Sequence, residues 1–175
     1  FQHQYLFGKN LLIIPTENIK KVLEEFSEIG TKNAIIISAG FKEIGEKGII
    51  LEKEIKKFAQ EKGLNFVGPN CIGIINTSIS LNTTVVSIDN SPGKLGLISQ
   101  SGTYVAQALP YLDEKGIKFS KAISVGNETV INMTDALEYM GKDDDTKAII
   151  LYIEGIKEGK RFIEIAKKVT PNKPV

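Results

Sequence analysis

The sequence predicts an α/β protein, and three features of its pattern support this. Short, uniformly apolar runs alternate with longer segments in which apolar residues recur every three or four positions. Glycines and prolines fall between the two kinds of segment and mark the turns. No apolar run approaches the length of about 18 residues that indicates a membrane span. Apolar strands that alternate with amphipathic helices are typical of a parallel sheet covered on both faces.

The first half contains three expected strands and two expected helices. The strands cover residues 11–14 and 34–37 and begin again at Phe66. Thr16 is placed to cap the first helix, which Gly30 ends, and Gly63 closes the second helix. The apolar stripes of these helices contain Ile19, Val22, Leu23 and Phe26 in the first, and Leu51, Ile55, Phe58 and Ala59 in the second.

The second half repeats the alternation of strands and helices. Strands are expected at residues 95–98, 119–125 and 148–153, and helices from residue 104 onward, near 131–140 and around 162–169. Between the halves, residues 76–93 are polar and longer than an ordinary strand–helix connection. This predicts a boundary between two α/β units, residues 1–91 and 92–175.

Composition excludes several classes of function. The chain has 22 basic and 21 acidic residues, a net charge of +1 and a single arginine, Arg161, so nothing indicates a nucleic-acid partner. The single cysteine, Cys71, excludes an intramolecular disulfide and is expected to be a small buried packing residue rather than a nucleophile. Residues 143–145 are three aspartates without metal-ligand spacing, so we expect a solvated loop and no metal site. With no signal peptide at its start, the chain is expected to be cytoplasmic.

The turn at residues 99–103, Ser-Gln-Ser-Gly-Thr, has two interpretations of equal weight. It follows an apolar strand and precedes a helix, so backbone N–H groups and the hydroxyls of Ser101 and Thr103 converge at a helix N-terminus. Such a place favours an anion, usually phosphate. The alternative is an ordinary helix cap.

Glu154 is the second unusual strand end, because it follows the apolar run 148–153 directly. A carboxylate at the carboxyl end of a parallel strand is expected to face a cleft and to hold a cation, a hydroxyl or a histidine. The alternative is a helix-capping acid before Lys157.

Five stretches give the sequence a family resemblance. They are residues 35–43 (IIISAGFKE), 68–77 (GPNCIGIINT), 93–103 (GKLGLISQSGT), 119–128 (FSKAISVGNE) and 148–162 (AIILYIEGIKEGKRF). In this order, the chain resembles the alpha-type part of the NDP-forming acyl-CoA synthetase superfamily, which includes the alpha subunit of succinyl-CoA synthetase and the ADP-forming acetate–CoA ligases. The resemblance implies the C-terminal part of a Rossmann-like CoA-binding domain over residues 1–91. It implies a truncated, flavodoxin-like succinyl-CoA-ligase-type domain over residues 92–175.

The resemblance also implies a reaction: acyl-CoA, ADP and phosphate give acid, CoA and ATP through an acyl phosphate and a phosphohistidine. Ser101, Gly102 and Thr103 would bind phosphate, Glu154 would orient the phosphorylated histidine, and Asn70 would lie near the thioester. The remaining implied positions are Pro15, Thr16, Ser38, Ala39 and Gly40 in the CoA groove, and Gly126 and Asn127 beside the histidine loop. CoA is the implied substrate. ADP or ATP with Mg would be held by a beta-type ATP-grasp part, either a subunit or a fused domain, in an oligomeric enzyme.

The sequence departs from the family in two respects: the first strand of the CoA domain with its glycine-rich loop is absent, and so is the catalytic histidine. The catalytic histidine of the family follows the strand that would begin at Lys173-Pro174-Val175, whereas the single histidine here is His3. We therefore expect a fragment that is inactive alone. The alternative is a non-catalytic CoA- or acyl-CoA-binding regulatory module. A nucleotide-binding dehydrogenase half is disfavoured, because it requires a G-x-G-x-x-G turn that the sequence lacks.

Overall fold

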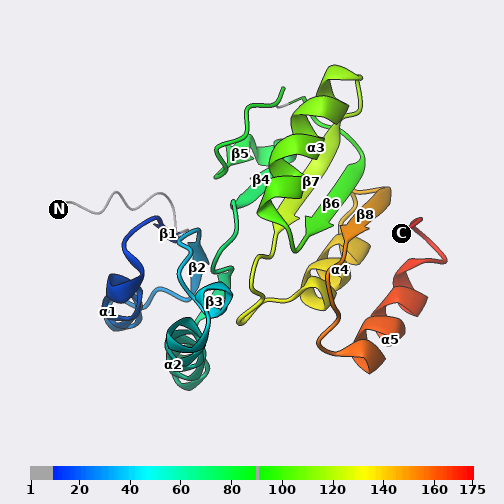
Figure 1. Ribbon diagram of the computed structural model, residues 1–175. Coiled ribbons are helices and arrows are strands. Elements are labelled where there is room, and N and C mark those ends of the chain that lie inside the picture. The colour runs from blue at the N-terminus through cyan, green and yellow to red at the C-terminus, as the bar shows by residue number, and fades with distance from the viewer. Residues whose placement is uncertain (1–9, 90) are drawn as a thin grey trace.

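The computed structural model describes residues 10–89 and 91–175, and its strands form two separate sheets (Figure 1). The first sheet contains β1 (Asn10–Leu12), β2 (Asn33–Ile36) and β3 (Asn65–Val67), in that spatial order and all parallel. Helices α1 (Thr16–Glu28) and α2 (Glu46–Lys62) make the two crossovers, and a short 3-10 helix, η1 (Lys42–Ile44), precedes α2. Because successive right-handed crossovers run in one direction along the sheet, both helices lie on the same face.

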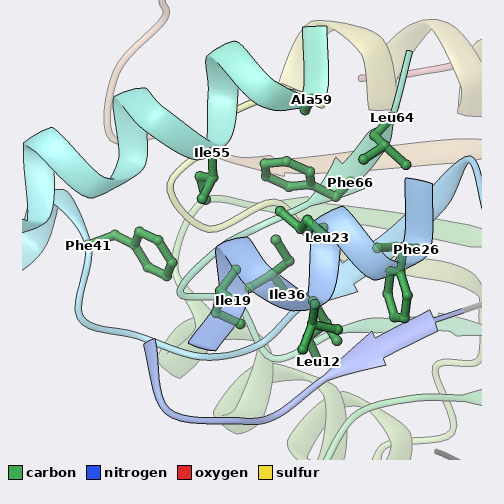
Figure 2. Packing of buried hydrophobic residues seen from close by; sticks show 12 residues of the cluster. Leu12, Ile19, Leu23, Phe26, Ile36, Phe41, Ile55, Ala59, Leu64 and Phe66 are labelled. Atoms are coloured by element: carbon green, nitrogen blue, oxygen red, sulfur yellow. The ribbon is translucent and has the colours of Figure 1, made fainter. Parts of the chain in front are cut away.

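The core of this unit lies between the two helices and the three strands (Figure 2). Ile19, Leu23 and Phe26 of α1 point into it, as the apolar stripe of the sequence predicted. Ile55 and Ala59 of α2 are fully buried in the same cluster. Gly63 ends α2 in the left-handed conformation (φ 64°), as expected of a helix-terminating glycine.

Thr16 does not cap α1, which corrects the prediction. Pro15 occupies the N-cap position, and Thr16 is the first residue of the helix. Its hydroxyl donates instead to the backbone carbonyl of Ala39, in the turn after β2. The side chain thus ties together the ends of two neighbouring strands.

The second sheet has the order β5-β4-β7-β6-β8 (Figure 1). The strands are β4 (Ile74–Asn76), β5 (Leu81–Asn82), β6 (Leu95–Ser99), β7 (Phe119–Ser124) and β8 (Ala148–Tyr152). Strand β6 lies between β7 and β8 and is parallel to both, as predicted. However, β4 is antiparallel to both β7 and β5, so this sheet is mixed and not wholly parallel.

Helices cover both faces of the second sheet. Leu97 of β6 packs with α3 (Gly102–Glu114), whereas the next residue, Ile98, packs with α4 (Met133–Lys142) and α5 (Gly159–Val169). Successive residues of a strand point to opposite faces, so this alternation follows from the strand itself. Residues 95–98 form an uninterrupted apolar run because helices cover β6 on both faces of the sheet.

The segment between the two predicted units is more structured than a linker. Strand β4 ends at the first residue of this segment, and the 3-10 helix η2 (Thr77–Ile79) and β5 lie within it. Both strands belong to the second sheet. The division between residues 91 and 92 stays a prediction, but residues 74–82 pair with the second unit and not with the first.

The loop after β7 joins the two units through its backbone. Asn127 donates an N–H to the carbonyl of Pro69 (2.9 Å), Thr129 donates to Gly68 (3.2 Å) and Ile131 to Phe66 (3.2 Å). These contacts run alongside the end of β3 and set the first unit against the carboxyl edge of the second sheet. None of the helices in the described ranges combines the length and apolarity needed to cross a bilayer.

The expectation of a solvated loop at residues 143–145 is wrong for Asp143. Both carboxylate oxygens accept from Nζ of Lys121 at 2.8 Å, and that lysine side chain in β7 is only 5% exposed. Burial alone raises the pKa of Asp143, but hydrogen bonds from Lys121 and Thr146 outweigh it and hold the pKa below its ordinary value. Asp143 is thus a structural partner of a buried ammonium group.

Candidate active site

A cavity of about 410 Å³ opens where the loop after β7 meets both units. It lies at the carboxyl ends of the parallel strands, where ligands bind in open α/β sheets. Its lining includes the predicted site residues Asn70, Ser101, Gly102, Thr103, Gly126, Asn127 and Glu154. It also includes Lys42, Glu43, Cys71, Ile72 and Gln100. The predicted phosphate and catalytic positions therefore meet at one place.

The turn before α3 caps the helix, which is one of the two interpretations, and anion binding there stays a prediction. Ser101 is the N-cap, and its hydroxyl oxygen accepts from the N–H of Tyr104 at 3.2 Å. Gly102 and Thr103 are the first two residues of α3, so their N–H groups have no carbonyl within the helix to bind. Since the turn lines the cavity, these N–H groups and the positive end of the helix dipole are available to an anion there.

Gly102 is in close contact with Ile72, which packs in the same apolar cluster as α3. A Cβ at this position would lie 2.8 Å from Cγ2 of Ile72. A larger residue would push the N-terminus of α3 away from the segment that carries Asn70 and Cys71. The glycine therefore keeps one wall of the cavity close to the other.

Glu154 follows β8 and lines both this cavity and an adjoining one of about 350 Å³. Helix α5 begins five residues later with Glu158 at its N-cap, so Glu154 does not cap that helix. Among the described residues, its exposed carboxylate has no ion pair or side-chain hydrogen bond. Glu154 therefore borders the cavity with a carboxylate that has no partner among these residues, and its role toward a ligand stays a prediction.

Asn127 connects the cavity walls through every polar atom it has. Its amide nitrogen donates to Glu43 (2.7 Å) and to Glu52 (2.8 Å), and its side-chain oxygen accepts from Asn70 (3.3 Å). Burial alone raises the pKa of Glu43, but hydrogen bonds from Asn127 and from backbone N–H groups outweigh it and lower the pKa below its ordinary value. Asn127 itself is 4% exposed. It acts as the connection between the two units.

Two lysines converge on the same backbone carbonyl. Nζ of Lys42 lies 2.9 Å from the carbonyl oxygen of Asn127, and Nζ of Lys157 lies 2.8 Å from it. Lys157 also donates to the carbonyl of Glu128 at 2.7 Å. Desolvation, followed by repulsion from Lys42, lowers the pKa of Lys157. Two ammonium groups and the carboxylates of Glu128 and Glu154 therefore share this side of the site.

The predicted CoA-groove residues form a separate group at the ends of β1 and β2. Ser38 bridges both strands, because its hydroxyl donates to the carbonyl of Ile14 (2.6 Å) and accepts from the Ile14 N–H (3.0 Å). Gly40 has φ 106°, and a Cβ there would lie 2.6 Å from Oγ1 of Thr16. The members of the group are Pro15, Thr16, Ser38, Ala39 and Gly40, none of which lines the 410 Å³ cavity. The Gly40 N–H donates to Glu43 at 2.6 Å and so links the group to that cavity.

Cys71 is a buried packing residue, as predicted. It is 4% exposed, and its thiol contacts the carbonyl oxygen of Ile36 at 3.4 Å. Burial raises its pKa to about 11, which leaves little of the reactive thiolate at neutral pH. In the described part of the chain, no cluster of three or more potential metal ligands occurs.

Four residues at the site were missed at the sequence level: Lys42, Glu43, Gln100 and Lys157. Each lies inside one of the five matched stretches and next to, or within three positions of, a predicted residue. This proximity to predicted site residues is the feature of the sequence that could have identified them. Their residue types could not, because lysine and glutamate are common on exposed surfaces.

Comparison with known proteins supports the division into two kinds of unit. A CoA binding domain model matches residues 11–77, and a succinyl-CoA ligase like flavodoxin domain model matches residues 92–175. The fold and the site therefore define a CoA-binding unit joined to a flavodoxin-like unit of the acyl-CoA ligase kind.

The chain is also similar to named proteins over most of its length. Acetate--CoA ligase [ADP-forming] II subunit alpha of Pyrococcus furiosus is 45% identical over 94% of this chain and 36% of that protein. Acetate--CoA ligase [ADP-forming] I of Archaeoglobus fulgidus is 39% identical over 94% of this chain, which spans 24% of that protein. The chain thus spans a quarter to a third of these relatives.

A solved structure agrees with this comparison. The dinucleotide forming acetyl-coenzyme A synthetase 1 of Ca. Korarchaeum cryptofilum, in complex with phosphate and ADP, matches with a TM-score of 0.90 and 32% identity. The match covers 95% of this chain and 36% of that one. The chain belongs to the NDP-forming acyl-CoA synthetase superfamily, in the alpha-type part that the ADP-forming acetate–CoA ligases share.

Proposed function

We propose that this chain is part of an ADP-forming acyl-CoA synthetase of the acetate–CoA type. The enzyme would interconvert acyl-CoA, ADP and phosphate with acid, CoA and ATP. The main support is the convergence of the Ser101–Thr103 turn, Glu154 and Asn70 on one cavity beside a CoA-binding unit. The named relatives are ADP-forming acetate–CoA ligases, which agrees with this assignment.

In the first step, phosphate would bind at the N-terminus of α3. An oxygen of this phosphate attacks the thioester carbon, the carbon–sulfur bond breaks, and CoA leaves as the thiolate, to be protonated. The Gly102 and Thr103 N–H groups would hold the phosphate, and the Asn70 amide would donate to the carbonyl oxygen as negative charge develops there. CoA itself would reach this point from the groove of Pro15, Thr16, Ser38, Ala39 and Gly40.

In the second step, a histidine nitrogen would attack phosphorus, and the acid would leave as its carboxylate. Glu154 would orient the imidazole and stabilise its positive charge, as carboxylates do for histidines elsewhere. The single histidine in this sequence, His3, lies in none of the five matched stretches, so we assign the phosphorylated histidine to another part of the enzyme. Gly126 and Asn127 would lie beside the loop that carries it.

In the third step, the phosphohistidine would pass its phosphoryl group to ADP. We assign ADP, ATP and Mg to an ATP-grasp part, carried on a second subunit or fused to the same polypeptide, in an oligomeric cytoplasmic enzyme. One relative is named as a subunit alpha, which agrees with a divided enzyme.

The proposal is tested with the full-length polypeptide that contains this chain and its ATP-grasp part, assayed for ATP formation from acetyl-CoA, ADP and phosphate. Thr103→Val removes one hydroxyl at the turn and should raise the KM for phosphate by about tenfold, with the KM for acetyl-CoA unchanged. Thr170→Val, at the exposed end of α5, is the matched control. CoA binding without any ATP formation would instead support the regulatory module.

A further inference from the structure

Gln100 links the two strand ends that form the candidate site. It directly follows β6, and its backbone N–H continues the β6–β8 ladder by donating to the carbonyl of Tyr152 at 3.2 Å. Its side chain then contacts the backbone just after β8. Oε1 accepts from the N–H groups of Glu154 (2.5 Å) and Gly155 (3.0 Å), and Nε2 donates to the carbonyl of Gly155 (2.6 Å).

The Gln100 amide therefore acts like an additional peptide unit of the sheet. A glutamine side chain carries the same carbonyl acceptor and N–H donor as the backbone. Here it pairs with Glu154 and Gly155, in the backbone that follows β8, beyond the last paired residues, Ser99 and Tyr152. The ladder is thus extended past the point where the two backbones separate.

This extension fixes Glu154 relative to the phosphate-binding turn. Gln100 immediately precedes Ser101, the N-cap of α3, while its side chain holds the backbone N–H of Glu154. The connection between β8 and α5 contains six residues, 153–158, in which Lys157 provides the other tie, to the carbonyls of Asn127 and Glu128. Of these two residues, Gln100 is the one that binds the backbone of Glu154 itself.

We propose that Gln100 is a positioning residue that sets the distance between Glu154 and the Ser101–Thr103 turn. This inference rests on the proposed function, because it assigns Gln100 an effect through Glu154. A displacement of about 1 Å at a reacting group lowers rates by as much as 100-fold. Loss of the Gln100 amide should therefore reduce catalysis through the displacement of Glu154.

The test is a double-mutant cycle on the full-length enzyme, read as the rate of phosphohistidine formation from acetyl-CoA and labelled phosphate. Gln100→Leu keeps the approximate side-chain volume and removes all three hydrogen bonds. It should slow the rate between about 10- and 100-fold, with the KM for acetyl-CoA unchanged. In a Glu154→Gln background, the same substitution should change the rate less than about twofold, because the two residues act as a unit. Gln107→Leu, at an exposed position of α3, is the control.

The outcomes separate this inference from the proposed function. If the wild type forms no phosphohistidine, the proposed function and the role of Gln100 both fail. If the wild type is active but the two substitutions have independent, multiplicative effects, or if Gln100→Leu is fully active, the inference alone is overturned. Should Gln100→Leu fail to fold, Gly155→Pro removes one N–H that Gln100 accepts and leaves Gln100 in place. It should slow the same step several-fold, and an unchanged rate would overturn the inference.

Discussion

The side-chain amide of Asn127 donates a 2.7 Å hydrogen bond to the carboxylate of Glu43, a residue 84 positions earlier in the sequence. This contact joins the loop after β7 to the 3-10 helix η1 after β2, and so connects the flavodoxin-like unit with the CoA-binding unit. The same amide donates to Glu52 at 2.8 Å. One buried residue thus satisfies two carboxylates from the other unit.

Replacement of Asn127 by aspartate should destabilise the protein strongly. The change removes the donor shared by Glu43 and Glu52 and places a third carboxylate against them. We expect the free energy of unfolding at neutral pH to fall by about 2–4 kcal/mol, measured by urea denaturation. Asn172→Asp, at an exposed position, should stay within about 0.5 kcal/mol of the wild type. Equal effects of the two substitutions would contradict the role of Asn127.

Glu43 should contribute to the pH dependence of stability. Its pKa in the folded protein is below the ordinary value of 4.5, so the unfolded chain takes up a proton first as the pH falls. The contribution of Glu43 is therefore present above about pH 4.5 and is lost as the pH falls through the folded pKa. Urea denaturation across this range should show that Glu43→Gln is less stable than the wild type near neutral pH and that the difference shrinks in acid. Glu24→Gln, at an exposed position of α1, is the control for loss of a surface carboxylate.

Gly126 should tolerate no side chain. It has φ 55°, and a Cβ would lie 2.3 Å from the carbonyl oxygen of Pro69 and 2.5 Å from that of Asn70. Gly126→Ala therefore combines a left-handed backbone with a clash against backbone atoms of the other unit. Gly116→Ala has the same kind of backbone (φ 79°) but meets nothing within 4 Å.

The comparison of these two alanines isolates the effect of the clash. Gly116→Ala should lower the free energy of unfolding by about 1 kcal/mol, the ordinary penalty of the conformation. Gly126→Ala should lower it by at least about 2 kcal/mol more, measured by denaturant unfolding. A similar loss for both would mean that the loop moves freely away from Pro69.

Much of this arrangement follows from local pattern in the sequence. Ser101 and Glu154 could be placed together because each follows an apolar strand, and parallel strands end at the same edge of a sheet. By contrast, β4 and β5 span only three and two residues, too few to show a period, so their antiparallel pairing could not be predicted. The convergence of Lys42 and Lys157 on one carbonyl depends on long-range packing, for which two lysines in exposed segments give no local sign. The sequence predicted that the Thr16 hydroxyl caps the adjacent helix, but the hydroxyl donates to the distant carbonyl of Ala39 instead.

The proposed function assigns phosphoryl transfer to the cavity between the two units, with Glu154 as partner of the histidine. The most direct measurement is the amount of acid-labile phosphohistidine formed when the full-length enzyme is incubated with acetyl-CoA and labelled phosphate. Glu154→Gln keeps the size of the side chain and removes its charge, so we expect the label to fall by about 100-fold or more. Glu164→Gln, at an exposed position of α5, should label like the wild type. Normal labelling of the Glu154→Gln enzyme would contradict the account.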